Sequence, residues 1–356
     1  MKSKAMVVTA PGKIEMRTFD LQETPADHVL VKTTVTSVCS TDLKVFQGST
    51  PVGRYPVIMG HEIAGKIVEI GREAAGFYDL KRGDRITIEP YISCGKCAES
   101  RSDYFYHYCN HGGIYGISLP CSRSPYLFGG YSEYFYLVPG TIIHKQNENM
   151  EDSAASISSV VANGVRWVKT LGNIGFGESV VISGPGSQGL CSIAAARHAG
   201  ANPVIVLGLE CDVDRLKLAE EFGAHHVINV DRDEPVAAVS SFAPDGVDAV
   251  IETSGTPRGI KTAVELVRRA GRIVNIGLSG GRETSINFDE LVWKSISIIN
   301  GLGQAGNVSD AMKLIDTGMY PFEKINNYTY RLEELPQALK DTEQRPPGFI
   351  KGAIVF

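Results

Sequence analysis

The chain has 356 residues, 43% hydrophobic and 21% charged, a composition typical of a folded protein of two or three domains and unlike that of a disordered chain. Its formal net charge is −5 and no run of like charges stands out, which argues against a nucleic-acid partner. No apolar stretch reaches the roughly 18 residues of a membrane span, and residues 1–10 lack the apolar core of a signal peptide. We therefore expect a reducing cytoplasm, where those of the seven cysteines that cluster serve as metal ligands or catalytic groups.

The first 150 residues are expected to form mostly β-structure. The segments 29–36, 62–70 and 85–89 are rich in the β-branched and apolar residues that strands favour. Gly71, Gly83 and Pro90 bound the second and third segments.

Side chains that bind metals occur beside two of these predicted strands. Cys39 and Asp42 follow the first strand, and His61 and Glu62 lie at the start of the second. A thiolate, an imidazole and a carboxylate are good zinc ligands, and a catalytic zinc keeps one coordination position open. Cys39, His61 and Glu62 are therefore candidate zinc ligands, although a single cysteine or histidine is more often a buried core residue.

Aromatic side chains are concentrated between residues 104 and 136, a window that contains eight of the 14 tyrosines. Three interpretations stay open for this window: an aromatic core, an oligomer contact, and a lid over an apolar substrate.

From about residue 151, short apolar runs alternate with helical segments, which indicates βαβ units and a parallel sheet. The expected strands are 179–183, 204–207, 227–230, 249–251 and 272–276. The last 50 residues are expected to add helices at 308–317 and 332–342 and a strand at 352–356.

A glycine-rich loop follows the first of these strands and precedes a helical segment. It reads Gly184-Pro185-Gly186-Ser187-Gln188-Gly189 and fits the G-x-G-x-x-G pattern of dinucleotide-binding loops. In that pattern the first glycine permits a tight turn, the second lets the backbone approach a pyrophosphate, and the third lets helix and strand pack closely. The helix N-terminus offers free N–H groups to the phosphates, so we predict that residues 184–189 bind a dinucleotide.

The segment expected to bind the adenosine ribose gives a less definite pattern. The second strand ends at Leu207, Gly208 follows, and three acidic residues occur before or next to Arg215, the first basic residue. The glycine leaves room for the 2′-phosphate of NADP, whereas the acids would repel it. The pattern favours NAD, and NADP stays the alternative.

In this order and spacing, the motifs resemble those of the zinc-dependent medium-chain alcohol dehydrogenases over nearly the whole chain. The matching segments are Cys39-x-Thr41-Asp42, 60–62, 83–85, 129–134, 184–189 and 350–355. The resemblance implies an α/β protein with a GroES-like β-rich catalytic domain, residues 1–158 and 304–356, and a Rossmann doubly wound parallel sheet, residues 159–303. It also implies that Lys351 contacts the cofactor pyrophosphate.

The resemblance assigns roles around a catalytic zinc. Cys39 and His61 would bind the zinc, and Asp42 would orient His61. Thr41 would hydrogen-bond the substrate hydroxyl and relay its proton, and Glu62 would lie beside the metal. Zinc would stabilise the alkoxide while hydride passes to the nicotinamide.

One departure from the family concerns the third zinc ligand, which the family takes from a helix after the first part of the catalytic domain. Residues 154–163 contain no Cys, His or carboxylate here. Either Glu62 completes the site, or the zinc is weakly bound or lost. We predict that Glu62 is a direct ligand for at least part of the cycle, with Ser159 and Asn163 as alternatives.

A second departure lies in the family's structural zinc lobe, whose four cysteines follow C-x2-C-x2-C-x7-C. Cys94 and Cys97 fit, but Ser100 takes the third position and Cys109 comes one residue late. Four thiolates at the usual spacing are thus excluded. Zinc bound by the three cysteines with Asp103, His107 or Cys121, and a metal-free lobe, both stay open.

The sequence therefore predicts a zinc-assisted, NAD(P)-dependent alcohol dehydrogenase that acts on a secondary alcohol or polyol, as a homodimer or homotetramer that binds neither nucleic acid nor membrane. A zinc-free quinone or alkene reductase of the same superfamily and a non-catalytic nucleotide-binding protein are the alternatives. The presence of Cys39, Asp42 and His61 together argues against the reductase, and Thr41 beside Cys39 argues against the non-catalytic protein.

Overall fold

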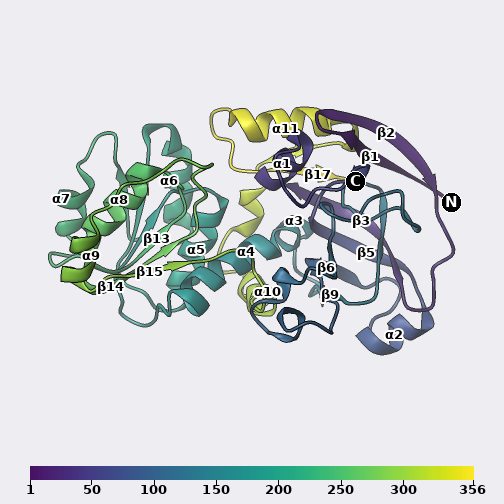
Figure 1. The fold of residues 1–356 in the computed structure, drawn as a ribbon, viewed down its shortest axis with the longest axis horizontal. Helices are drawn as coiled ribbons and strands as arrows, with labels where there is room; N and C mark the ends of the chain where they lie inside the picture. Colours follow the sequence, from purple (N-terminus) through teal and green to yellow (C-terminus); the bar gives the residue numbers. More distant parts are fainter. The chain divides into compact units, whose positions relative to one another are not determined.

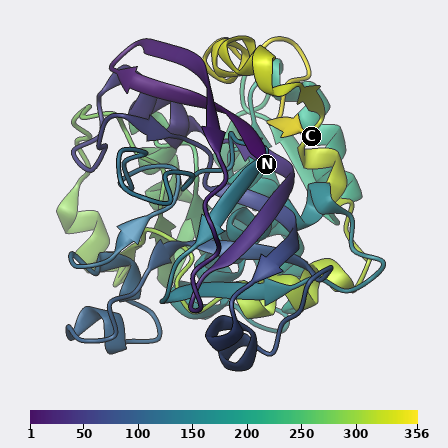
Figure 2. The same ribbon diagram turned by 90° about the vertical axis from the view of Figure 1, so that its right-hand side faces the viewer.

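The computed structural model describes all 356 residues and divides into two compact units. Unit 1 comprises Met1–Ser159 and Phe322–Phe356, and unit 2 comprises Val160–Pro321. Both termini belong to unit 1, as Figures 1 and 2 show. None of the helices has the length and apolar character needed to cross a membrane.

Unit 1 is built on antiparallel β-structure. A three-stranded sheet has the order β2-β1-β4, and a larger sheet has the order β16-β17-β3-β5-β6-β7, with β8 paired to β3 and β9 to β6. The strands are β1 (Lys2–Ala10), β2 (Lys13–Asp20), β3 (Val29–Val38), β4 (Val57–Ile58), β5 (Glu62–Ile70), β6 (Arg85–Ile92), β7 (Gly113–Ile114), β8 (Tyr134–Leu137), β9 (Thr141–Lys145), β16 (Tyr328–Tyr330) and β17 (Gly352–Val355). The helices of this unit are α1 (Ser40–Gln47), α2 (Arg72–Tyr78), α3 (Asp152–Ser156) and α11 (Leu335–Gln344), with 3-10 turns η1 (Glu99–Arg101), η2 (Tyr106–Tyr108), η5 (Phe322–Ile325) and η6 (Leu332–Glu334).

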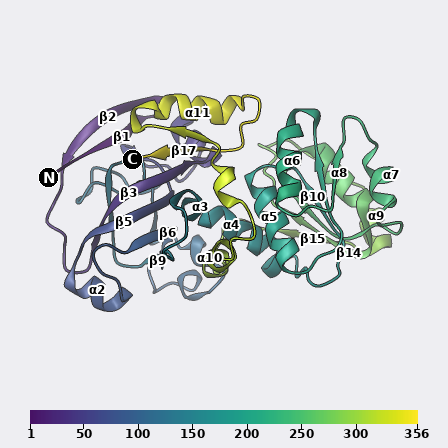
Figure 3. The ribbon, with the colours of Figure 1, turned by 180° about the vertical axis from the view of Figure 1, so that it is seen from behind.

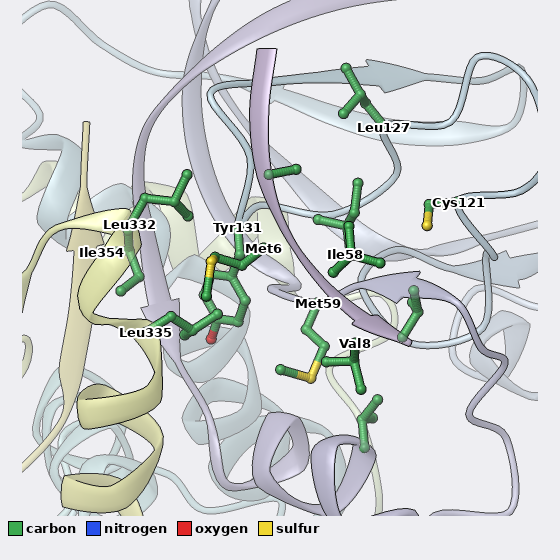
Figure 4. Close-up of a cluster of buried hydrophobic side chains, with 14 of the residues drawn as sticks. Met6, Val8, Ile58, Met59, Cys121, Leu127, Tyr131, Leu332, Leu335 and Ile354 are labelled. Atoms are coloured by element: carbon green, nitrogen blue, oxygen red, sulfur yellow. The ribbon is translucent and has the colours of Figure 1, made fainter. Parts of the chain in front are cut away.

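The core of unit 1 joins segments from both ends of the chain. Figure 4 shows Met6 and Tyr131 next to Leu332, Leu335 and Ile354 from the returning C-terminal segment, and all five are buried in one cluster. The aromatic window divides into two groups. Residues 115–136 supply the fully buried rings Tyr115, Phe128, Tyr131, Phe135 and Tyr136, whereas residues 104–108 include the exposed rings Tyr104, Phe105 and Tyr108.

Unit 2 is a six-stranded parallel sheet with the order β12-β11-β10-β13-β14-β15 and accompanying helices (Figures 1 and 3). The strands are β10 (Val180–Ser183), β11 (Val204–Gly208), β12 (His226–Asn229), β13 (Val247–Glu252), β14 (Val267–Asn275) and β15 (Ser297–Asn300). The helices are α5 (Ser187–His198), α6 (Val213–Glu221), α7 (Pro235–Ser240), α8 (Pro257–Leu266), α9 (Phe288–Lys294) and α10 (Val308–Asp316), with the short turn η4 (Glu210–Asp212). The strand order reverses at β10 and β13, and parallel sheets of this order bind ligands at the carboxyl ends of those strands.

The helix α4 (Ser158–Val165) and the π-helical segment η3 (Arg166–Leu171) connect the units in sequence. Residues 304–321, predicted to lie in the first domain, group with unit 2 instead. Thr170 Oγ1 donates to Asn307 Oδ1 at 2.7 Å, and Lys169 pairs with Asp310 at 2.6 Å. These bonds attach α10 to η3, so the chain returns to unit 1 at Phe322 rather than at residue 304.

Candidate functional site

Strand pairing brings the predicted zinc ligands of unit 1 together. β3 and β5 are antiparallel with Ser37 opposite Glu62, so Cys39, just beyond the end of β3, lies beside His61 and Glu62 at the start of β5. The ligand atoms of Cys39, His61 and Glu62 all lie within 4.8 Å of one another. His61 and Glu62 are buried and Cys39 is half-buried, so this group is largely shielded from solvent.

Asp42 fixes the orientation of His61. Its carboxylate is fully buried and accepts hydrogen bonds from His61 Nδ1 (3.1 Å), Cys39 N (2.9 Å) and Gly60 N (3.3 Å). A fourth bond comes from the hydroxyl of Tyr131 at 2.8 Å. Because Nδ1 must carry the proton that it donates to the carboxylate, His61 presents Nε2, which lies 4.0 Å from Glu62 Oε1. That nitrogen is the one available to a metal.

Mutual attraction shifts the pKa values of this pair in opposite directions. Burial alone would raise the pKa of Asp42, but His61, Cys39 N–H and Tyr131 hold it below its usual value. Burial alone would lower the pKa of His61, but Asp42 and Cys39 raise it well above its usual value. Metal binding requires a neutral imidazole, so binding at Nε2 releases a proton from this pair.

Lys351 contacts the same group from the C-terminal strand. β17 pairs with β3, Gly352 opposite Val38, and the buried Nζ of Lys351 lies 2.9 Å from Glu62 Oε2. Burial would lower the pKa of Lys351, but Glu62 and Cys39 raise it above its usual value. The residue that the family resemblance assigned to the pyrophosphate is thus ion-paired with a candidate zinc ligand, a contact that the sequence did not reveal.

The thiolate, imidazole and carboxylate that Cys39, His61 and Glu62 bring together form a donor set that fits a zinc ion. Thiolate, imidazole and carboxylate are the ligand types of zinc, and three protein ligands plus one open position are typical of catalytic sites. The hydroxyls of Ser156, at the end of α3, and of Ser158, at the start of α4, take part in buried hydrogen bonds instead. Ser156 Oγ bonds with Ser37 Oγ at 2.8 Å, and Ser158 Oγ with Thr87 Oγ1 at 3.0 Å. Ser159 is also buried. Thr41 is half-buried in the first turn of α1, two residues from Cys39.

A second group of metal-binding side chains lies in unit 1, formed by Cys94, Cys97 and Cys109, whose sulfurs lie within 4.8 Å of one another. The side chain of Ser100 and the N–H groups of Cys97 and Lys96 lower the pKa of Cys94 to about 6. The three residues considered as a fourth ligand do not belong to this group. Cys121 is buried in the apolar cluster of Figure 4, His107 packs against the rings of Tyr91 and Tyr108, and Asp103 is exposed.

The three glycines of the loop 184–189 in unit 2 differ in backbone conformation and in the space around them. Gly184 has φ +103° in the turn after β10, a conformation that favours glycine. A Cβ on Gly189 would lie 2.0 Å from the carbonyl oxygen of Gly184, so only glycine allows α5 to pack this closely. A Cβ on Gly186 would meet no atom within 4 Å, which leaves open space at the N-terminus of α5. Ser187 begins α5, and Gln188 accepts a hydrogen bond from Trp167 Nε1 at 3.3 Å.

A pocket at the carboxyl ends of β10 and β11 is lined by Gly184, Leu207, Gly208, Leu209, Asp212, Val230, Pro235 and Arg258, among others. Asp212 is buried, accepts from the Leu209 N–H at 3.2 Å and pairs with Arg215 at 2.8 Å. Glu210 forms an ion pair with Arg232. Arg215 is therefore engaged by an acid in the segment predicted to bind the adenosine ribose.

Glu252, at the end of β13, is a residue that the sequence analysis missed. Its carboxylate is fully buried and accepts hydrogen bonds from the N–H groups of Ser254 (3.0 Å) and Gly255 (2.9 Å). The next residue, Thr253, donates from Oγ1 to Ser183 O (2.8 Å) and Gly184 O (3.0 Å). Glu252 thus holds the loop after β13 against the glycine-rich loop. The only sequence signal was an acid at the end of an apolar run.

Family models and known proteins match most of this chain. Residues 25–147, within unit 1, match the family model "Alcohol dehydrogenase GroES-like domain", and residues 189–317, within unit 2, match "Zinc-binding dehydrogenase". A probable alcohol dehydrogenase of Mycobacterium tuberculosis is 34% identical over 93% of this chain and 91% of the relative. An L-threonine 3-dehydrogenase of Pyrococcus horikoshii is 32% identical over 93% of this chain and 92% of the relative.

Solved structures of dehydrogenases have a fold similar to that of this chain. An alcohol dehydrogenase from Thermotoga maritima has a TM-score of 0.89 at 26% identity, with 100% of this chain and 99% of that chain covered. A zinc-binding dehydrogenase from Sinorhizobium meliloti, solved with NADP, also has a TM-score of 0.89 at 26% identity, with both chains fully covered.

Proposed function

This chain belongs to the zinc-type medium-chain dehydrogenase family, and we propose that its Cys39, His61 and Glu62 hold the zinc of the reaction. The protein is a nicotinamide-dependent alcohol dehydrogenase that interconverts an alcohol and its ketone or aldehyde. The α/β fold class predicted from the sequence, a GroES-like domain followed by a Rossmann-like domain, is confirmed.

The convergence of the three ligand atoms within 4.8 Å supports the zinc assignment. When bound there, zinc would supply Lewis-acid stabilisation of the alkoxide oxygen. Asp42 holds the proton of His61 at Nδ1 and so keeps Nε2 free. We assign to Thr41 the binding of the substrate hydroxyl and the transfer of its proton, since it lies on the first turn of α1 beside Cys39.

Lys351 has a positioning role in this proposal. Its ammonium neutralises the charge of buried Glu62 at 2.9 Å, and a charge buried without a partner is costly. Glu62 therefore has two cationic partners, Lys351 and the zinc. We propose that Glu62 moves between them when the substrate oxygen binds.

The segment after β11, which is predicted to bind the adenosine ribose, favours NAD over NADP as the cofactor. The glycine-rich loop 184–189 is the proposed site of the cofactor phosphates. Arg215, the first basic side chain after β11, is paired with Asp212, so it is not free to bind a 2′-phosphate. Arg258 also lines the pocket and donates to Val230 O at 3.3 Å. Comparison of kcat/KM for NAD and NADP tests this choice, and a clear preference for NADP would point to Arg258 as a phosphate ligand.

A secondary alcohol or polyol is the proposed substrate class. Relatives in the same range of identity are named for L-threonine and sorbitol, both of which carry secondary hydroxyl groups. Oxidation rates with a series of primary alcohols, secondary alcohols and polyols test this proposal, and faster turnover of primary alcohols contradicts it.

Metal analysis and one pair of variants test the zinc assignment. Cys39→Ala should lower the zinc content by one ion per chain and abolish alcohol oxidation, because it removes the thiolate ligand. Cys191→Ala is the matched control, since this thiol is buried in α5, in unit 2. Full activity of Cys39→Ala at wild-type zinc content would contradict the assignment.

A zinc-free reductase of quinones or alkenes is the second candidate, because the ammonium of Lys351 already supplies a cation to Glu62. It requires that the purified enzyme reduce an alkene or quinone with NADPH or NADH when no zinc is bound. Alcohol oxidation that depends on zinc contradicts this candidate.

We also propose a homodimer or homotetramer in a reducing cytoplasm. β15 is an edge strand of the unit 2 sheet and can pair with another chain. The helix that precedes it in the chain, α9, has three apolar side chains that are 70–72% exposed, Phe288, Val292 and Trp293. Sedimentation analysis of the wild type and of Trp293→Glu tests this surface. A wild type that sediments as a monomer contradicts it. Cysteines that serve as metal ligands need a reducing compartment, and cell fractionation tests that location.

A further inference from the structure

We propose that the buried carboxylate of Glu252 makes the Ser254 and Thr256 side of the unit 2 pocket a hydrogen-bond acceptor, by which the pocket selects the donor groups of an adenosine. Ser254 and Thr256 line this pocket, and Glu252 lies behind them. Glu252 is thus a positioning residue, since it acts on the ligand through two hydroxyl groups. The inference rests on the proposed binding of the dinucleotide beside the loop 184–189 and names how its adenosine half is recognised.

Glu252 ends β13 as a fully buried acid without a cationic partner. Its oxygens accept hydrogen bonds instead. Oε1 accepts from the Ser254 N–H at 3.0 Å and from Ser183 Oγ at 3.4 Å, and Oε2 accepts from the Gly255 N–H at 2.9 Å. Backbone N–H groups can only donate, so both oxygens act as acceptors, which is the pattern of an ionised carboxylate.

The chain packs closely around this carboxylate. A Cβ on Gly259, in the first turn of α8, would lie 2.6 Å from Oε1. A Cβ on Gly277, after β14, would lie 2.7 Å from Oε2. Because both oxygens are held by N–H groups and the surrounding chain is this close, the carboxylate keeps the same partners.

The carboxylate fixes the direction of two hydroxyl groups. Ser254 Oγ donates its single proton to Glu252 Oε1, so it can only accept from its other neighbours. It accepts from the Thr256 N–H at 3.2 Å, and the Thr256 hydroxyl, 3.1 Å away, must donate to it as well. Thr256 Oγ1 in turn accepts from the Gly259 N–H at 2.9 Å.

Thr256 Oγ1 is the atom of this chain of hydrogen bonds that a ligand can still use. A hydroxyl has one proton and two lone pairs, and here the proton and one lone pair are engaged, so an acceptor position remains. The amino group of adenine and the ribose hydroxyls are donors that can occupy it. A carbonyl in place of the amino group, or a phosphate on a ribose hydroxyl, would set two acceptors against each other, which is costly. A site built for a donor therefore rejects a ligand that lacks it.

Binding of three dinucleotides to the full chain tests this inference: NAD, NADP, and the hypoxanthine analogue of NAD, which has a carbonyl in place of the amino group. Equilibrium titration gives each dissociation constant, and the ratio of the constant for NADP or for the analogue to that for NAD measures the selection of a donor. Thr256→Val removes the acceptor and should lower the ratio about fivefold or more for the ligand that lacks the recognised donor. Thr256→Ser keeps the hydroxyl and should keep the wild-type ratio. The ligand whose ratio falls identifies the donor as the amino group or the 2′-hydroxyl.

Glu252→Gln tests the carboxylate itself. Where the amide nitrogen faces Ser254 Oγ it donates to that oxygen and reverses the direction of both hydroxyls, so the same ratio should fall. Asp248→Asn is the matched control, because Asp248 lies on the same strand and also accepts hydrogen bonds from an N–H and a hydroxyl, both of Ser179, but does not line the pocket. The control should lose stability and keep the ratio, which separates a positioning role from a structural one.

Two results would overturn the inference. One is a wild type that binds the hypoxanthine analogue and NADP as tightly as NAD, because no donor would then be selected. The other is a ratio that neither Thr256→Val nor Glu252→Gln changes, because other groups would then select the adenosine. A wild type that binds none of the three dinucleotides contradicts the proposed function as well. Circular dichroism shows that the variants compared are folded, and Thr256→Val carries the test if Glu252→Gln does not fold.

Discussion

Replacement of Tyr131 by phenylalanine removes one hydroxyl and tests how His61, the proposed zinc ligand, is held. The ring of Tyr131 is fully buried in the apolar cluster of unit 1 (Figure 4), so phenylalanine keeps the packing. The deleted hydroxyl donates to Asp42 Oδ2 at 2.8 Å. Burial and the charge of Asp42 raise the pKa of Tyr131 well above its usual value, so this hydroxyl is a permanent donor.

The expected cost has two components. A buried hydrogen bond to a charged acceptor contributes about 1.5–3 kcal/mol to the free energy of unfolding, and the loss should be of this size because Asp42 Oδ2 keeps only the Cys39 N–H at 2.9 Å. Zinc affinity should also fall, by up to about tenfold, the lower limit for partners that orient a metal-bound histidine. The effect is at this limit because Tyr131 acts on His61 through Asp42.

Denaturant unfolding and zinc competition with a chelator measure the two components. Tyr136→Phe is the matched control, since its hydroxyl is bonded at 2.7 Å to a neutral acceptor, Gln22 O, and its ring is also fully buried. The control should lose about 0.5–1.5 kcal/mol and keep its zinc affinity. If both variants lose the same stability and neither loses zinc affinity, the Cys39 and Gly60 N–H groups alone hold Asp42 and the reasoning is wrong.

Three further predictions concern other parts of the molecule. Glu62→Gln should weaken zinc binding by at least about tenfold and recover part of its activity in excess zinc. Chelator competition measures the zinc affinity, with Glu69→Gln, an exposed position on the same strand, as the control. Unchanged zinc binding and turnover would refute a ligand role for Glu62. Gly186→Val should weaken dinucleotide binding at least about tenfold, or 1.4 kcal/mol, because the valine side chain fills the open space at the N-terminus of α5. Fluorescence titration measures the affinity, with Gly175→Val as the control because position 175 also has open space around it. Equal affinities of the two variants would place the phosphates elsewhere. Burial alone would raise the pKa of Asp248, but Ser179 and Arg268 hold it below its usual value. Asp248→Asn should therefore have its full destabilising effect at pH 7 and a progressively smaller one below about pH 4, where the carboxyl of the unfolded chain binds a proton. Urea unfolding at pH 7 and pH 3 measures this, and a loss of stability that does not depend on pH contradicts it.

The elements of the fold follow from local sequence patterns. The β-branched segments 29–36 and 62–70 form β3 and β5, and the alternation after residue 151 forms the parallel sheet. In the loop 184–189, the positive φ of Gly184 and the close packing at Gly189 follow from the glycine pattern. Cys39 and His61 could be paired because their spacing has a known family pattern.

Contacts between distant segments could not be predicted in the same way. Lys351 meets Glu62 only because β17 pairs with β3 in one register, and a strand of four residues carries no signal for its partner or register. The hydroxyl of Tyr131 donates a hydrogen bond to Asp42, which lies 89 positions earlier in the chain. The domain boundary near residue 304 was wrong because hydrogen bonds, rather than a change of composition, attach α10 to η3.

The discontinuity of unit 1 has a consequence for synthesis on the ribosome. Leu332, Leu335 and Ile354 complete the cluster that contains Met6 and Tyr131, and Lys351 is the cation beside Glu62. About 200 residues separate Ser159 from the C-terminus, so at roughly 5–20 residues per second the first segment waits about 10–40 s for its partners. Unit 2 is continuous and can fold during that interval. The nascent N-terminal strands meanwhile expose an apolar face, so chaperone capture should be strongest while residues 160–321 are being made and should end when β17 emerges.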